Sequence, residues 1–89
     1  MNTSNSCSVY AIFIESHIIV GCDTKNEVFD ILNMLIDYKT DGEVSFYEEL
    51  SKLQEAFIAN GVTFKNFNDQ IPWKIINMLI KPYGLSVGR

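Results

Sequence analysis

Two helix-start signals constrain the fold of this chain more than any other feature of its sequence. Thr24 is followed three residues later by Glu27, and Ser45 is followed in the same way by Glu48. At this spacing each side chain can satisfy a free backbone N–H of the other residue, which is the pattern of a capping box. Both pairs precede apolar residues at helical spacing, most regularly in the second case: Phe46, Leu50, Leu53 and Phe57. The sequence therefore predicts two amphipathic helices, each ending where a glycine follows.

Two short apolar runs precede the first helix. Residues 9–14 and 18–22 are rich in β-branched and aromatic side chains, and Glu15, Ser16 and His17 separate them. This pattern predicts an antiparallel hairpin. Since the first run is apolar at successive positions, both faces of its strand need cover from other parts of the protein.

A third helix is expected over residues 70–81. Asn68 or Asp69 can cap it, and Pro72 is tolerated in its first turn. Residues 85–87 follow a glycine and are expected to form a short terminal strand.

The predicted order is a β-hairpin, three helices and this C-terminal strand, which defines an α+β fold. The chain has 89 residues, of which 47 % are hydrophobic. This length allows one small domain, expected over residues 9–89 after a flexible N-terminus at 1–8, and excludes doubly wound nucleotide-binding folds and barrel enzymes.

The third helix is apolar on two faces. On a helical wheel Ile71, Ile75, Met78 and Leu79 fall on one side, and Trp73, Ile76 and Ile80 fall roughly opposite. Such a helix is either central to the core or shared between the core and a binding partner. Under the second interpretation the predicted apolar anchors for a partner protein are Phe67, Trp73, Ile76, Ile80 and Tyr83.

Acidic residues are concentrated in the middle of the chain, and the formal net charge is −4. Glu48, Glu49 and Glu55 are predicted as charges at the rim of the partner-binding surface. A run of this kind is either a solvated face or a means of steering toward a basic partner.

The residues that could support catalysis are few. His17 is the only histidine, and it falls in the predicted turn, away from any partner nucleophile. Neither cysteine has the spacing of a metal-binding motif, and the five glycines are scattered rather than gathered in a phosphate-binding loop. We therefore expect no enzyme activity, no cofactor and no bound metal.

These patterns favour a small binding module that occupies the surface of a partner protein, an inhibitor or adaptor of the size that phages and plasmids encode. One alternative is a DNA-binding regulator of the helix-turn-helix kind, although the acidic net charge argues against nucleic-acid binding. Another alternative is a homodimeric structural protein. With two cysteines, no signal-peptide pattern and no long apolar run, the chain is expected to be cytoplasmic and not membrane-bound.

Overall fold

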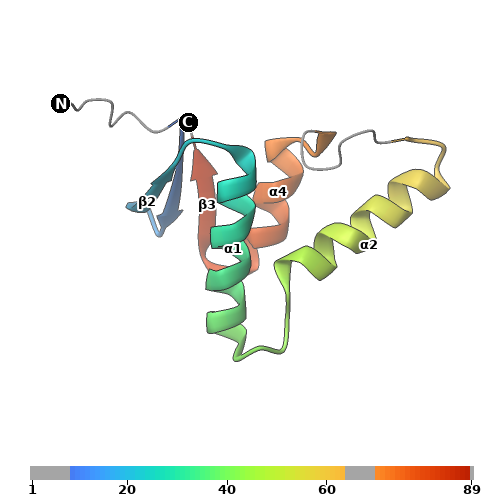
Figure 1. Cartoon of the computed structure of the whole chain (residues 1–89). Coiled ribbons are helices and arrows are strands. Elements are labelled where there is room, and N and C mark those ends of the chain that lie inside the picture. Colours follow the sequence, from blue (N-terminus) through green and yellow to red (C-terminus); the bar gives the residue numbers. More distant parts are fainter. Residues whose placement is uncertain (1–8, 64–69, 89) are drawn as a thin grey trace.

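The structure has the α+β architecture that the sequence predicts (Figure 1). It is a computed structural model that describes residues 9–63 and 70–88, so the predictions for residues 1–8 and for Phe67 lie outside the described residues. In chain order the elements are β1 (Tyr10–Ile14), β2 (His17–Cys22), α1 (Lys25–Thr40), α2 (Phe46–Ala59), α4 (Trp73–Ile80), the 3₁₀ turn η1 (Lys81–Tyr83) and β3 (Leu85–Gly88).

The hairpin turns where the polar residues of the sequence predict it. Ile14 pairs with His17, and the two residues between them, Glu15 and Ser16, have φ angles of 48° and 76°. Positive φ at both central positions is the geometry of a type I′ turn, whose twist matches that of paired strands. Neither residue is glycine or asparagine, so this turn is costly for its sequence.

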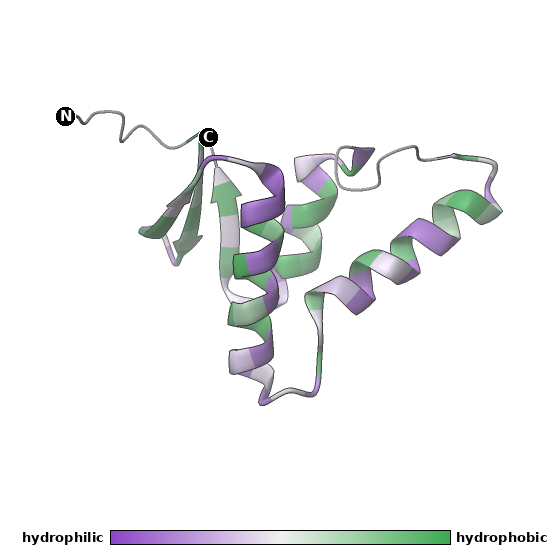
Figure 2. Ribbon diagram, in the orientation of Figure 1, coloured by the Kyte–Doolittle hydropathy of each residue, from purple (hydrophilic) through white to green (hydrophobic). Residues whose placement is uncertain are grey.

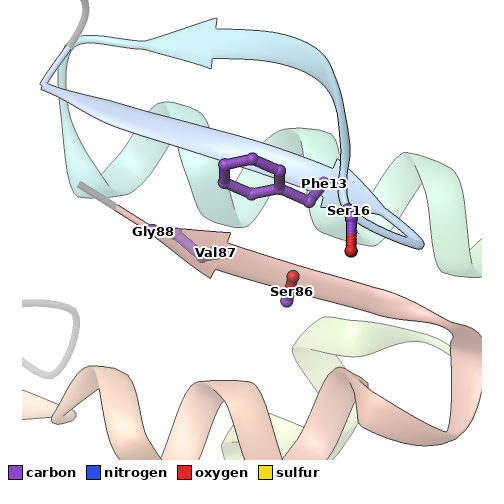
Figure 3. Close-up of a pocket in the computed structure, with 5 residues that line it drawn as sticks. All are labelled: Phe13, Ser16, Ser86, Val87 and Gly88. Atoms are coloured by element: carbon purple, nitrogen blue, oxygen red, sulfur yellow. The ribbon is translucent and has the colours of Figure 1, made fainter.

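The three strands form one antiparallel sheet in the order β2-β1-β3. Alternate residues of β1 face opposite sides. Tyr10, Ile12 and Ile14 pack on the core, whereas Ala11 and Phe13 lie on the other face. Figure 3 shows Phe13 on the near side of the sheet with α1 passing behind it. None of the described helices covers this outer face, so the expectation of cover on both sides is not met within the described residues.

Thr24 and Ser45 cap their helices as the sequence predicts, each through one of the two hydrogen bonds of a capping box. The Thr24 hydroxyl accepts a hydrogen bond from the Glu27 amide at 3.2 Å, and the Ser45 hydroxyl accepts one from the Glu48 amide at 3.4 Å. Hydrophilic and hydrophobic residues alternate along α1 and α2, as expected for helices that bury one face (Figure 2).

The third predicted helix is shorter than expected. α4 begins at Trp73, and Pro72 stands before it as the N-cap residue with an extended ψ of 148°. Pro72 therefore lies outside the first turn, contrary to the prediction, because its extended backbone ends the preceding segment. The predicted caps Asn68 and Asp69 lie outside the described residues. Gly84, with φ of 75°, then turns the chain from η1 into β3.

The core lies between the inner face of the sheet and the helices α1 and α4. Among the described residues, its buried members come from the three strands, from α1, α2 and α4, and from the segment just before α4: Ile12, Cys22, Val28, Phe29, Leu32, Ile36, Phe46, Leu50, Ile71, Ile76, Ile80 and Leu85. The fully buried residues of α2, Phe46 and Leu50, lie in its first half, and Phe57 in its second half packs against the core while partly exposed. The axis of α2 runs away from the sheet (Figure 1).

Candidate functional site

The corner between α1 and α2 is fixed by side chains on both helices. The Asn33 side-chain oxygen accepts hydrogen bonds from the Ser45 hydroxyl at 2.9 Å and from the Tyr47 amide at 3.3 Å. Thr40 donates to the Ile36 carbonyl at 2.7 Å and accepts from the Val44 amide at 3.2 Å. The bond from the Tyr47 amide satisfies an N–H that the first turn of α2 leaves free, and the other bonds tie the connecting residues to α1. The helices are therefore held at a defined angle.

Tyr47 links the same two helices at the surface. Its hydroxyl donates a hydrogen bond to the Asp30 carboxylate. Partial burial, together with this hydrogen bond and the negative charge of Asp30, raises the pKa of Tyr47 to about 12. The side chain is still 37 % exposed, so its ring contributes to the molecular surface.

Large exposed side chains follow one row along α1 from this point. Asp30, Met34 and Tyr38 are four residues apart and therefore neighbours on one side of the helix. Met34 is 61 % exposed and Tyr38 is 85 % exposed. The exposed carboxylates of Asp37 and Asp41 flank the same row. We call this surface the α1 face and define it by Asp30, Met34, Asp37, Tyr38, Asp41 and Tyr47.

A hollow lies at the C-terminal end of the α1 face. It is lined by Asp37, Tyr38, Asp41 and Gly42. The C-terminus of a helix carries partial negative charge from its free carbonyl groups, and two carboxylates add to it here. Among the described residues no basic side chain forms an ion pair with either carboxylate. The electrostatics of the hollow therefore favour a cation.

Two of the anchors predicted on the third helix are part of the core. Ile76 and Ile80 are fully buried, because α4 packs these side chains against the sheet and α1. The expectation that these two side chains are exposed to a partner is therefore corrected. For Ile76 and Ile80, the interpretation of this helix as central to the core is the one that the structure supports.

The other predicted apolar anchors are half-buried or lie outside the described residues. Trp73 packs against Tyr10 with ring centroids 4.7 Å apart, and the Lys25 ammonium lies 5.0 Å from the centre of its ring. Lys25 also donates to the Ile71 carbonyl, which fixes the approach to α4. Tyr83 packs against the edge of the core. These contacts give Trp73 and Tyr83 structural roles.

The predicted rim charges remain at the surface of α2. Glu48 and Glu55 are exposed, and Glu49 is half-buried with Lys52 at 3.8 Å. They lie on a different helix from the buried Ile76 and Ile80, so the predicted anchors and rim do not form one surface. The two sets are separated because α4 turns its most apolar side inward.

Met34 and Tyr38 are not among the residues to which the sequence points as partner contacts. Both fall on the side of the first helix that Asp30 and Asp37 mark as polar. A large apolar residue within a polar stripe is the signal that could have found them, because such a side chain has no place in the protein's own core.

The remaining chemistry of the described residues is limited. They contain no group of three or more His, Cys, Asp or Glu side chains placed to hold a metal ion. His17 is exposed beside the hairpin turn. No helix in the described part of the chain has the length and apolar character needed to cross a membrane.

Comparison of the chain with protein-family models, curated proteins and solved structures found no match. The helix-turn-helix alternative stays a prediction.

Proposed function

We propose that this protein is a small binding module that occupies the surface of a partner protein, as an inhibitor or an adaptor, and that the α1 face makes the contact. The observation that carries the proposal is the exposure of Met34 and Tyr38 among carboxylates. Methionine and tyrosine are enriched at the centres of protein interfaces, where a partner removes them from water. On this surface Asp30 lies in the same row of α1 and accepts a hydrogen bond from Tyr47.

The charges of the α1 face indicate the chemistry of the partner. Asp30, Asp37 and Asp41 surround the apolar row, and the hollow beside Tyr38 fits the cationic end of a lysine or arginine side chain. Complementary charge raises the association rate and selects among partners more than it raises affinity. The proposed partner is therefore a protein that presents a basic segment.

The rigidity of the α1–α2 corner supports the same proposal. The hydrogen bonds of Asn33 and Tyr47 hold the surface in one shape before any partner arrives. A preorganised surface loses less conformational entropy on binding than a mobile one.

A photo-crosslinking side chain placed at position 38 tests the proposal in cells of the native host. The matched control carries the same group at position 78, because Met78 on α4 is 67 % exposed but lies outside the α1 face. We expect one dominant crosslinked protein from position 38 and none from position 78. Equal crosslinking from both positions, or none from either, contradicts the proposal.

Once that protein is identified, variants measure the contribution of each part of the face. Tyr38→Ala should weaken binding by about 2 kcal/mol, or roughly thirtyfold in Kd, as expected for a central interface tyrosine. Asp37→Asn with Asp41→Asn should mainly slow association and reduce its dependence on salt. Met78→Ala should leave both quantities unchanged.

A further inference from the structure

The two edge strands of the sheet, β3 and β2, differ in whether their outward backbone groups have hydrogen-bond partners. At the β3 edge the side chain of Asn77 acts as a neighbouring strand would. Its amide oxygen accepts from the Val87 N–H at 2.8 Å, and its NH₂ group donates to the Val87 carbonyl at 3.2 Å. Both outward backbone groups of Val87 are thus satisfied, and α4 packs beside this edge.

The same two bonds determine which backbone groups point outward at the other edge. Because the polar groups of Val87 turn away from β1, its partner Ile12 must direct its own groups toward Val20 in β2. Successive residues alternate along an antiparallel ladder, so the N–H and C=O of Gly21 point away from β1. Ile14 and His17 flank the two-residue turn and direct their backbone groups toward each other. The next residue of β2, Ile18, therefore directs its N–H and C=O away from β1.

The β2 edge lacks most of the features that keep edges from pairing. Residues 17–22 contain no lysine, aspartate, glutamate or proline. Ile18 is 66 % exposed, Ile19 is also exposed, and β2 has no neighbouring strand on this side among the described residues. An open, apolar and uncharged edge of this kind is a template for a further strand.

A β-bulge in β2 determines which kind of strand can pair with its open edge. The register with β1 shifts between Ile12 and Phe13, so that two residues, Ile19 and Val20, lie between the outward groups of Ile18 and Gly21. A regular strand offers one residue between its outward positions and falls out of register. A second copy of β2 has the same two residues and matches.

We propose that β2 pairs with β2 of a second copy of this chain, antiparallel, with Ile18 of each copy opposite Gly21 of the other. In this register Glu15 faces Thr24 and Asp23 faces Ser16, so no like charges meet. The result is a six-stranded sheet whose two outer edges are both β3, where Asn77 satisfies the outward groups of Val87. The assembly therefore ends at two copies instead of growing into a fibre. It is independent of the contact proposed for the α1 face.

Two measurements on the full chain test this pairing. Sedimentation velocity at protein concentrations up to about 1 mM should show a reversible dimer, since a single strand pair is a small interface. Hydrogen exchange should show that the amides of Ile18 and Gly21 become protected as the dimer forms. A chain that stays monomeric throughout, or a dimer in which both amides exchange as fast as exposed ones, overturns the proposal.

Variants separate this edge from other surfaces. Ile18→Lys places a charged, strongly hydrated side chain on the pairing edge of each copy and should weaken dimerisation at least tenfold. Met78→Lys, at a side chain of nearly equal exposure, should dimerise as the wild type does, and so should Tyr38→Ala. Should Ile18→Lys fail to fold, the exchange measurement on the wild-type chain still decides. Loss of the dimer in Tyr38→Ala but not in Ile18→Lys would place the dimer contact on the α1 face and contradict the pairing.

Discussion

At the scale of single residues, Tyr47 shows how one hydroxyl couples the fold to pH. Its pKa in the folded chain is about 12, above the ordinary value of 10. A group whose pKa is raised by folding stabilises the fold in its protonated form, fully at pH values below 10. That stabilisation is lost as the pH rises from 10 through 12.

We predict that Tyr47→Phe removes this alkaline sensitivity. At pH 7 the variant should lose about 1 kcal/mol or less, because the lost hydrogen bond to Asp30 is partly exposed to water. Between pH 10 and 12 its stability should fall less steeply than that of the wild type. Urea unfolding across this range measures both effects, and Tyr38→Phe is the matched control. If Tyr47→Phe and the wild type follow the same alkaline profile, the bond to Asp30 does not contribute.

Cys22 adds a second, separate alkaline group. Its thiol is buried at the end of β2, and this burial, followed by the charges of Glu27 and Asp23, raises its pKa above the ordinary value of 9.0. The sign is the same as for Tyr47, since the neutral thiol is the form that the fold prefers. The two contributions can be told apart because Tyr47→Phe leaves the thiol in place.

At the scale of elements, the hairpin turn carries a cost that its sequence could avoid. Glu15 and Ser16 both have positive φ, which suits asparagine and glycine far better. We predict that the double change Glu15→Asn with Ser16→Gly stabilises the protein by about 1 kcal/mol. Chemical denaturation measures the gain. Ser86→Gly is the control, because β3 is extended there and the same change should destabilise.

Asn77 joins the last helix to the last strand. Its side chain alone satisfies both outward groups of Val87. We predict that Asn77→Ala costs about 1–3 kcal/mol, since a half-buried N–H and C=O lose their partners. The opened β3 edge should also make the variant more prone to aggregate. Thermal unfolding and light scattering test the two effects, with Asn60→Ala at the exposed end of α2 as control. A variant as stable and soluble as the control would contradict the role of Asn77.

Elements with local signals could be predicted from the sequence. The hairpin and the starts of α1 and α2 follow from neighbouring residues, such as Thr24 with Glu27, whose hydrogen bonds form within one turn. The side of α4 that faces the core could not be predicted, because both of its sides are apolar and only tertiary packing distinguishes Ile80 from Met78. The α1 face could not be predicted either, because Met34 and Tyr38 lie among acidic residues and this side of the helix therefore has the pattern of a polar face.

At the scale of the whole molecule, the apolar residues of the described chain are divided between one core and several exposed positions. α1 contributes four buried residues to the core, and α4 contributes two, Ile76 and Ile80. The exposed apolar side chains include those of the α1 face and of β2, as well as Met78 on α4 and Ile58 on α2. The acidic α1 face and the uncharged edge of β2 lie on separate elements. One copy can therefore present its α1 face to a partner while its β2 pairs with a second copy.

The central position of α4 leads to a test of the whole fold. We predict that Ile80→Asp unfolds the protein, because a buried unpaired carboxylate costs several kcal/mol and a domain of this size has little more stability than that. Met78→Asp, two residues earlier but exposed, should change stability by less than about 0.5 kcal/mol. Circular dichroism and thermal unfolding compare the two variants directly. A folded Ile80→Asp with a midpoint close to that of the wild type would mean that α4 does not close the core. The apolar row on α4 would then again be the stronger candidate for a binding surface.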